Sequence, residues 1–324
     1  MINFRIFISI SLILFFSNIT YSQTCCSGGV PISGNLGLPP GTTGTWQFSL
    51  GYDFNVLKTF MDETEVIDDH SRERVTQSIL FQTGYSFSAR FSVDLFLSYV
   101  KQERTIRNFG KTGFTSTSGF GDAALLLKYN LSKSTANLTL LTIGAGPKIP
   151  TGRSDLTRED GIPLNADLQP GSGSWDGLFW GNGIYKFGFR PTFNISSTLI
   201  YSYKGKNNQY LGSQTYQFGN EFQALISVND NFLIGNKIID TSISIRYRKA
   251  LRDRFNDLTM PNTGGEWIFI APSIAYNFSQ KFAVNAIFEV PLYANVVGTQ
   301  LSPTYRINVG VFYKINKKNE ILQF

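Results

Sequence analysis

Hydrophobic and polar residues alternate with a period of two from Thr45 onward, the pattern of β-strands whose two faces meet different surroundings. Residues 45–56 show it first, with large apolar side chains on one face and small or polar side chains on the other. The apolar face is Trp46, Phe48, Leu50, Tyr52, Phe54 and Val56, and the other face is Gln47, Ser49, Gly51, Asp53 and Asn55. Residues 305–315 repeat the pattern near the end of the chain.

The alternation recurs in twelve segments, each longer than the strand of about 5–6 residues that is common in globular proteins. They are residues 45–56, 74–88, 91–103, 119–131, 137–149, 174–187, 191–203, 215–228, 236–249, 265–278, 281–293 and 304–316. A strand that crosses a membrane needs ~9–11 residues. The pattern therefore predicts membrane-crossing strands.

Short and long connections alternate between these segments. The short ones lie near 88–90, 132–136, 188–190, 229–234 and 279–281, and the long ones near 57–74, 104–118, 150–173, 204–214, 250–264 and 294–303. Outer-membrane barrels have short periplasmic turns and long extracellular loops, and their sheet closes so that each backbone group has a partner. We therefore predict an all-β fold, a transmembrane antiparallel up-and-down β-barrel of about 12 strands over residues 45–316, in the outer membrane of a Gram-negative bacterium.

The residues outside the barrel have three predicted roles. Residues 1–22 combine Arg5, an apolar stretch and a small-residue end, as in a secretory signal peptide. A retained membrane anchor is the alternative, but the apolar run is shorter than the ~20 residues that a spanning helix needs. Residues 23–44 are rich in Gly and Pro and are a candidate plug, and residues 317–324 form a C-terminal tail. The adjacent Cys25 and Cys26 either serve redox or intermolecular pairing or have a minor structural role.

Composition narrows the function classes. Charged residues are 16% of the chain, against about 25% in a typical soluble domain, and the hydrophobic 42% argues against disorder. A single His and two neighbouring Cys argue against a Cys/His metal cluster, so we expect no metal and no cofactor. The formal net charge of +6 forms no basic stripe, and we expect no nucleic-acid partner.

Strand parity places a set of charged residues on the polar, inward face of the barrel. These candidate lumen-lining residues are Asp53, Asp94, Asp122, Lys128, Glu221, Asp240, Arg246, Arg248, Glu289 and Arg306, with Lys314 near the last strand's end. They either line a solute path or pair as a structural network. Because a buried unpaired charge is costly, residues of opposite sign should be neighbours in both cases.

Catalysis is not expected. Some outer-membrane barrels of this strand number are lipid hydrolases that use Ser and His, and the only histidine here is His70, within the predicted loop 57–74. A catalytic base must be held against its nucleophile by a third group, which a loop does poorly. The same loop has several acidic residues but no calcium-loop spacing, so a solvated acidic rim is the expected reading.

Several strings carry a family resemblance. In chain order they begin at Ser118, Gly146, Leu168, Glu289 and Gly298: SGFGD, GPKIPTG, LQPGSGSWD, EVPLY and GTQL, followed by Tyr305-Arg306. In this order the chain resembles the outer-membrane proteins grouped with the MetA pathway of phenol degradation, which are related to hydrophobic-compound transporter barrels. The resemblance implies an outer-membrane barrel and passage of small, hydrophobic or aromatic solutes, with no catalytic residues to transfer. Residues 23–44 and 57–74 match no motif of that family.

The predicted function is a passive outer-membrane channel or transporter, whose partners are outer-membrane lipid and a small-molecule solute. A barrel of 8 strands is filled by side chains and one of 16 leaves an aqueous channel, so about 12 strands is intermediate. The alternative is a non-conducting structural or surface-interaction barrel.

Overall fold

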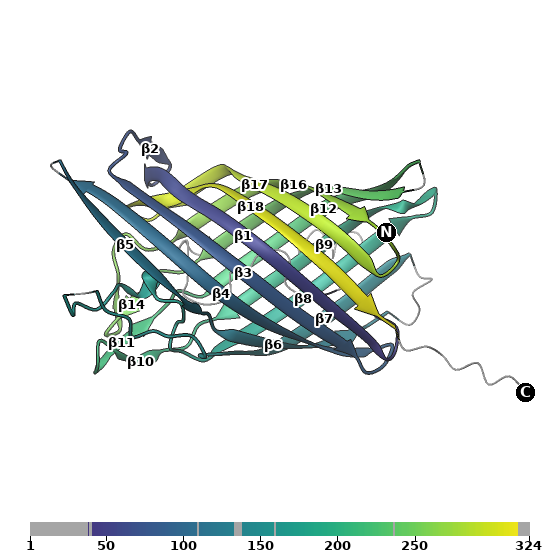
Figure 1. Ribbon diagram of the computed structural model, residues 1–324, viewed down its shortest axis with the longest axis horizontal. Helices are drawn as coiled ribbons and strands as arrows, with labels where there is room; N and C mark the ends of the chain where they lie inside the picture. Colours follow the sequence, from purple (N-terminus) through teal and green to yellow (C-terminus); the bar gives the residue numbers. More distant parts are fainter. Residues whose placement is uncertain are drawn as a thin grey trace, which may run out of the picture.

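A computed structural model describes residues 38, 41–108, 110–132, 138–158, 160–235 and 237–316. They form a closed antiparallel barrel with 12 strands around its wall, which confirms the predicted fold (Figure 1). The wall strands are β1 (Thr45–Asp62), β3 (Arg72–Ser86), β4 (Phe91–Asn108), β5 (Lys111–Phe120) with β6 (Ala123–Asn130) in one position, β7 (Thr139–Ile149), β8 (Asp176–Phe187), β9 (Arg190–Tyr203), β12 (Glu221–Ile234), β13 (Lys237–Ala250), β16 (Gly265–Asn277), β17 (Phe282–Val296) and β18 (Thr299–Ile315). Pairing of β18 with β1 closes the sheet.

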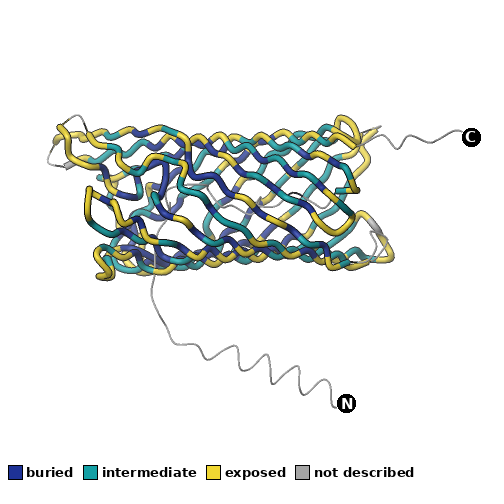
Figure 2. Tube along the Cα trace, turned by 90° about the horizontal axis from the view of Figure 1, so that it is seen from below, coloured by how far each residue is buried: buried dark blue, intermediate teal, exposed yellow. Residues whose placement is uncertain are grey.

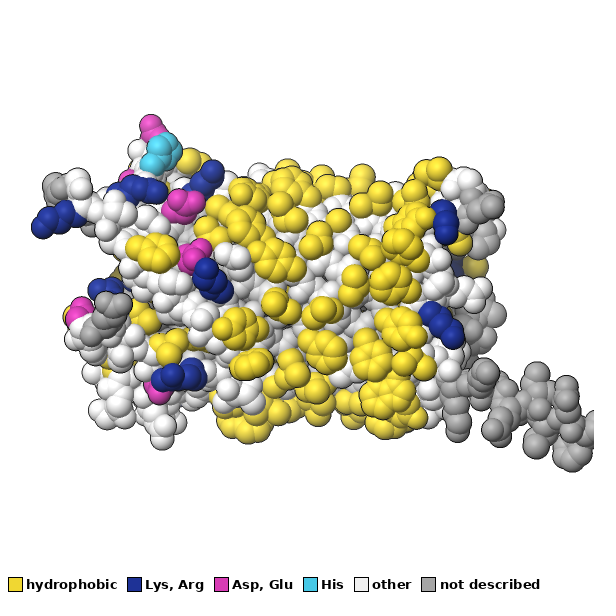
Figure 3. All heavy atoms as spheres, viewed as in Figure 1, with side chains coloured by type: hydrophobic (Ala, Val, Ile, Leu, Met, Phe, Trp, Pro, Cys, Tyr) yellow, Lys and Arg dark blue, Asp and Glu magenta, His cyan; other side chains and the backbone are white. Residues whose placement is uncertain are grey.

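The predicted outward face is the exposed face. Along each strand exposed and buried positions alternate, and the exposed ones are mostly large apolar residues that form a band around the barrel (Figures 2 and 3). On β1, for example, Trp46, Leu50 and Tyr52 are exposed whereas Gln47 and Asp53 are buried. Such a band suits contact with lipid, because apolar side chains are more favourably surrounded by hydrocarbon than by water.

The two ends of the barrel differ. The start of β1 and the end of β18 lie at the end with tight turns, on the right in Figure 1, and we call this the periplasmic end. The other, extracellular end carries the long loops and small elements that do not belong to the wall. These elements are β2 (Glu65–Ile67), η1 (Ala166–Leu168), β10 (Asn207–Tyr210), β11 (Gln214–Gln217), β14 (Arg254–Phe255) and β15 (Leu258–Thr259).

Some predicted boundaries were wrong. The strand predicted at 215–228 is β12, which begins at Glu221 and runs through the predicted link 229–234 to a turn at Gly235. The long links predicted at 104–118 and 294–303 are mostly strand, because β4 and β5 form one hairpin and β17 and β18 meet in a tight turn. The alternation is weak there, since these extensions rise out of the apolar band.

The interior is not uniformly polar, which corrects the prediction that the inward face of each strand is polar. A buried apolar cluster lies on the inner side of β4, β6, β8 and β9, and a second lies near the extracellular end. The first comprises Phe96, Ala124, Leu126, Leu178, Trp180 and Ile200, and the second Met61, Ala250, Trp267, Phe269, Ala294 and Val296. Trp267 fits the interfacial aromatic girdle by sequence, but its side chain is 0% exposed and points inward. The first cluster fills part of the interior on that side of the barrel.

The ladder between β17 and β18 ends at the pair Glu289–Arg306, although both strands continue toward the extracellular end. Beyond that pair, β17 stays paired with β16 and β18 stays paired with β1. Pro291 and Pro303 lie in the parted segments, and a proline has no N–H to donate to a ladder.

Among the described residues no helix is long and apolar enough to cross a membrane. The predicted signal peptide, Cys25 and Cys26, and the tail 317–324 lie outside the described residues.

The apolar band makes a stability prediction. Ile243 lies in the middle of β13, faces outward and is 59% exposed. Ile243→Arg should lower the free energy of unfolding in lipid vesicles by about 2–4 kcal/mol, because it puts a cation into hydrocarbon. Denaturant titration of the reconstituted barrel measures this.

Leu258→Arg is the matched control, since Leu258 is 75% exposed but lies on β15, in an extracellular loop. It should leave the unfolding free energy nearly unchanged. Equal effects of the two substitutions would contradict the placement of the band in the membrane.

Candidate functional site

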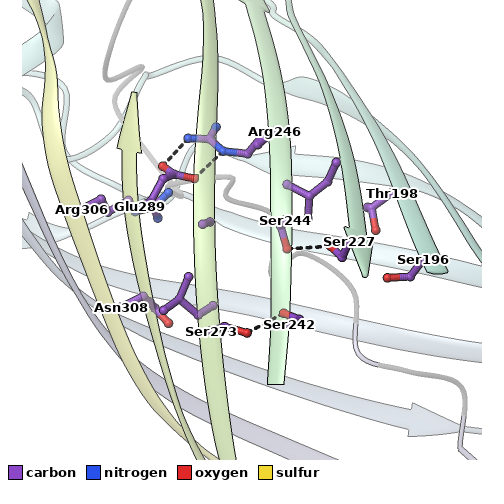
Figure 4. A pocket seen from close by; sticks show the side chains of 13 residues that line it. Ser196, Thr198, Ser227, Ser242, Ser244, Arg246, Ser273, Glu289, Arg306 and Asn308 are labelled. Carbon is purple, nitrogen blue, oxygen red and sulfur yellow. Dashed lines mark hydrogen bonds and ion pairs between the residues drawn. The ribbon is translucent and has the colours of Figure 1, made fainter. Parts of the chain in front are cut away.

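A cavity of about 230 Å³ lies inside the barrel, against the wall formed by β9, β12, β13, β16, β17 and β18 (Figure 4). Most of the wall side chains that face it are small. The hydroxyl-bearing ones are Ser196, Thr198, Ser227, Ser242, Ser244 and Ser273. Ser196, Ser227, Ser244 and Ala271 stand side by side on four neighbouring strands. A row of such short side chains leaves the space that larger residues fill on the opposite wall.

The hydroxyls of the cavity are partly satisfied by one another. Ser227 and Ser244 share a hydrogen bond of 2.7 Å, and Ser242 and Ser273 share one of 2.6 Å (Figure 4). A hydroxyl retains acceptor capacity when it donates one hydrogen bond. The wall therefore stays neutral and can still accept or exchange hydrogen bonds with a solute.

Ion pairs border the cavity on its extracellular side. The Arg246 guanidinium donates two hydrogen bonds to the Glu289 carboxylate, at 2.8 and 2.5 Å, and its carbon lies 4.2 Å from the Phe269 ring centre. Arg306 donates to Asp53 at 2.7 Å. Bidentate geometry and stacking hold a guanidinium in one position. The boundary of the cavity is thus rigid and its charges are compensated.

A neighbouring pair extends this network. Arg248 donates to Glu221 at 2.7 Å and stacks over the Trp267 ring, with its carbon 4.9 Å from the centroid. The inward position of Trp267 is explained by this contact, because a cation inside the barrel gains from an aromatic face.

A second ion cluster lies on the opposite wall. Lys148 Nζ is 2.5 Å from Asp122 and 3.1 Å from Asp176, while Lys204 Nζ is 3.3 Å from Asp176. The Lys148 side chain is 1% exposed. Ser172 donates to Asp122 both from its backbone N–H and from its hydroxyl. Such a buried group is tolerated because each charge meets an opposite one and further hydrogen bonds.

This cluster unites three strings that are far apart in the sequence. Asp122 ends SGFGD, Lys148 lies in GPKIPTG, and Ser172 and Asp176 lie in LQPGSGSWD. Gly152 of the second string and Gly171 of the third approach closely, since a Cβ added to Gly152 would lie 2.7 Å from the Cα of Gly171. Three of the strings that carry the family resemblance therefore build one structural anchor.

The anchor holds the loop 150–175 inside the extracellular mouth. Asp167 in η1 pairs with the inward Arg74 at 2.8 Å, and the carbonyl of Leu168 accepts from Thr117 at 2.7 Å. Gln102 donates to the carbonyl of Gln169 at 3.3 Å. The loop is thereby tied to β3, β4 and β5 and covers part of the mouth.

Near the periplasmic end a third pair contacts the segment that precedes β1. Asp94 and Lys128 are 2.8 Å apart and almost fully buried. The Leu38 N–H donates to Asp94 at 2.9 Å, and Lys128 donates to the Leu38 carbonyl at 2.6 Å. One point of the candidate plug 23–44 therefore lies within the barrel, whereas residues 23–37, 39 and 40 lie outside the described residues.

A small cap joins the other extracellular loops. Tyr216 donates its hydroxyl hydrogen to Asp253 at 2.6 Å, and Asp253 also accepts from the Gly219 N–H at 2.9 Å. Tyr210 and Phe218 pack beside it. Burial, and then the nearby Asp253 carboxylate, raise the pKa of Tyr216 far above its ordinary value, because both disfavour the phenolate.

The sequence-predicted residues fall into groups. Arg246, Glu289 and Arg306 line the cavity. Asp53, Glu221 and Arg248 complete its ion pairs, Asp122 belongs to the second cluster, and Asp94 and Lys128 form the third. Asp240 accepts a hydrogen bond from Asn277 at 2.8 Å, away from these clusters, and Lys314 lies half-buried near the end of β18. Their role in solute passage stays a prediction.

Among the described residues, five charged side chains of these ion clusters were not predicted from the sequence. They are Arg74, Lys148, Asp167, Asp176 and Lys204. Lys148 on β7 and Arg74 on β3 lie at inward positions of the alternating pattern, so the sequence could have predicted both. Nothing local distinguishes Asp167 from the exposed charges of its loop.

His70 lies on the surface of an extracellular loop. The His70 side chain is 90% exposed and lies 3.5 Å from an equally exposed Asp68. Among the described residues no group of three or more His, Cys, Asp or Glu is placed to hold a metal ion.

Comparison with known proteins gives two matches of interest. A family model described as "Putative MetA-pathway of phenol degradation" matches residues 72–294, more than half of the chain. The COG4313 outer membrane channel from Pseudomonas putida F1 superposes with a TM-score of 0.66 at 12% identity, covering 87% of this chain and 99% of that one. This likeness is one of fold.

A weaker likeness is to a Pseudomonas aeruginosa FadL homologue, with a TM-score of 0.44 at 8% identity over 91% of this chain and 99% of that one. No curated protein matches the sequence.

The Arg246–Glu289 pair makes an energetic prediction. Arg246→Ala or Glu289→Ala alone should destabilise the barrel by about 3–5 kcal/mol, because each leaves one charge buried without its partner. The double variant should cost clearly less than the sum of the two single ones. Denaturant titration of all four forms gives the coupling energy, and strict additivity would contradict the pairing.

Tyr216 makes a pH prediction. Its raised pKa means that the folded cap favours the neutral phenol, so this stability is fully present below about pH 10, the ordinary tyrosine pKa, and is lost as the pH rises above it. Tyr216→Phe should weaken the cap by about 1.5–3 kcal/mol at neutral pH, the worth of a hydrogen bond to a charged group, and flatten its alkaline loss. Limited proteolysis of the loops at rising pH measures both, with the exposed Tyr203→Phe as control. An alkaline profile unchanged by Tyr216→Phe would show that another group controls it.

Proposed function

This chain belongs to the MetA-pathway family of phenol degradation, and from that premise we propose that it is an outer-membrane channel for the passive passage of small, hydrophobic or aromatic molecules. The observation that carries the proposal is the cavity inside a barrel whose outer face is apolar. A structural barrel of this width has no need of an open, hydroxyl-lined interior.

The lining suits a solute that is held weakly. Leu225, Ala271 and Ile287 offer apolar surface beside the serine hydroxyls. The charges at the boundary are already neutralised by one another, so they offer no strong site for a charged solute. Conduction needs binding that is favourable enough for entry and weak enough for release. Small amphiphilic molecules such as phenols fit both conditions.

Passage would also involve the two barrel ends. The loop 150–175 covers part of the extracellular mouth, and Leu38 lies between Asp94 and Lys128 near the periplasmic one. Both are held by hydrogen bonds and ion pairs rather than by covalent links. We infer that they filter or gate the path.

A lipid hydrolase is the less suitable reading. A catalytic histidine needs a nucleophile and an orienting group within hydrogen-bond reach. The exposed His70 contacts Asp68, on a loop away from the cavity. We infer that the chain is not an enzyme.

The second candidate is a non-conducting structural or surface-interaction barrel. The inward part of the loop 150–175, which is paired with Arg74, and the filled wall around Leu126 and Trp180 favour it. Solute uptake separates the two functions.

Filling the cavity tests the proposal. Ser244 lies at the centre of the hydroxyl wall and is buried. Ser244→Phe should lower phenol uptake into vesicles that contain the folded barrel severalfold, because the ring occupies the open space. The measurement is the rate of uptake per folded barrel, with folding verified by the shift of the unheated band in gel electrophoresis.

Ser116→Phe is the control, because Ser116 is an exposed residue of β5 outside the cavity. Its uptake rate should equal that of the native barrel. If the native barrel admits no more phenol than protein-free vesicles, the channel proposal fails and the non-conducting barrel is favoured.

A further inference from the structure

The two ends of the barrel carry different charge patterns. At the extracellular end cations and acids occur together, and five ion pairs join them on the surface. These pairs are Lys101–Glu103, Arg107–Glu73, Arg153–Asp155, Lys206–Asp257 and Lys249–Glu266. The charges of that end therefore cancel over short distances.

At the periplasmic end the cations predominate. Each connection there that the structure describes has one in the turn or beside it: Arg90 between β3 and β4, Arg190 between β8 and β9, Lys237 between β12 and β13, and Lys281 between β16 and β17. All four are exposed. We call these four residues the periplasmic cation ring.

Acids are scarce at this end. Among the described residues the surface acid there is Asp230, 3.0 Å from Arg190. Asp94 and Asp240 share strand faces with inward residues and contact Lys128 and Asn277 instead. On the face shown in Figure 3, basic side chains border the periplasmic edge of the apolar band, and the acidic ones gather at the opposite end.

The ring lies directly beside aromatic side chains. Arg90 donates to the Tyr129 hydroxyl at 3.1 Å, and the Arg190 guanidinium carbon is 5.4 Å from the Phe232 ring centre. Lys281 precedes Phe282, whose ring centre lies 5.4 Å from that of Phe278 in a tilted arrangement. Aromatic girdles mark the depth at which headgroups begin. The cations therefore lie at the level of the phosphates of the periplasmic leaflet.

The distribution of the ring indicates its partner. The four residues belong to turns spread around the circumference of the barrel, because their strands occupy separate places in the sheet order. A protein partner would contact one patch, whereas a shell of lipid surrounds the whole wall. Cations near a membrane surface attract anionic lipids.

We propose that the periplasmic cation ring binds the headgroups of anionic phospholipids in the periplasmic leaflet and so fixes the depth of the barrel. The inference rests on the proposed membrane location but not on conduction. The phosphate of such a lipid accepts hydrogen bonds from the guanidinium or ammonium groups. Its acyl chains lie along the aromatic side chains on the membrane side of the ring.

Lipid selectivity tests the proposal. The full chain is reconstituted in phosphatidylcholine vesicles with a trace of spin-labelled phosphatidylglycerol or spin-labelled phosphatidylcholine, and the motionally restricted fraction gives the relative association of each lipid with the barrel. The native protein should prefer phosphatidylglycerol severalfold, and added salt should reduce the preference.

The variant Arg90→Gln/Lys237→Gln/Lys281→Gln should bring the preference close to unity. Arg190 is left in place because Asp230 already neutralises it. The matched control is Lys58→Gln/Lys111→Gln/Arg158→Gln, which removes one arginine and two lysines that are exposed at the extracellular end and belong to none of the five ion pairs, and it should keep the preference.

Equal association of both labelled lipids with the native barrel would overturn the proposal and leave the ring to an acidic periplasmic protein. Equal losses in the two triple variants would also overturn it, because they would show a general charge effect. The lipid preference of the native barrel, measured at low and high salt, tests the proposal without any variant. Phenol uptake by the same vesicles separates the hypotheses, since an impermeable barrel that prefers phosphatidylglycerol refutes only the channel.

Discussion

The structure depends on one constraint, the need of each backbone N–H and C=O in hydrocarbon for an internal partner. Pairing of β18 with β1 removes both free edges, and it runs nearly the full length of the two strands, from Trp46–Ile315 to Asp62–Thr299. Closure then divides the side chains of each strand into a lipid-facing set and an enclosed set. The apolar band, the buried charges and the cavity all follow from that division.

The enclosed charges organise the interior. Away from water each must find an opposite charge, and the pairs at Arg246–Glu289, Lys148–Asp122 and Lys128–Asp94 do so on different walls. They tie neighbouring strands, the loop 150–175 and Leu38 to the wall of the barrel. Open space remains where the wall offers Ser and Ala instead of charged or bulky side chains. The cavity is thus the part of the interior that the networks leave unfilled.

Strand positions were predictable because one period-two signal repeats along the chain and lipid imposes it on each strand. The prediction was weakest where that cause is absent. The predicted segment 215–228 is displaced from β12 (Glu221–Ile234), because its first residues belong to the extracellular strand β11 and β12 continues past residue 228. The extensions of β4, β5, β17 and β18 lie outside the apolar band. The inward side chain of Trp267 shows a related limit, because an aromatic residue that faces the interior looks the same in sequence as one in a girdle. Its contact with Arg248 is visible only in the structure.

Parity along single strands was enough to predict a closed barrel of about 12 strands with an apolar exterior and to place eleven charged residues on the inner face, because those properties depend on neighbours one and two residues away. Which charge meets which was decided only by the register between strands and by the path of the loops. Asp122, Lys148 and Asp176 come from three separate strings, and Asp167 reaches Arg74 across 93 residues of chain. Such contacts depend on how the sheet closes and on how its loops fold back into the barrel. A local sequence pattern does not encode contacts between residues so far apart in the chain.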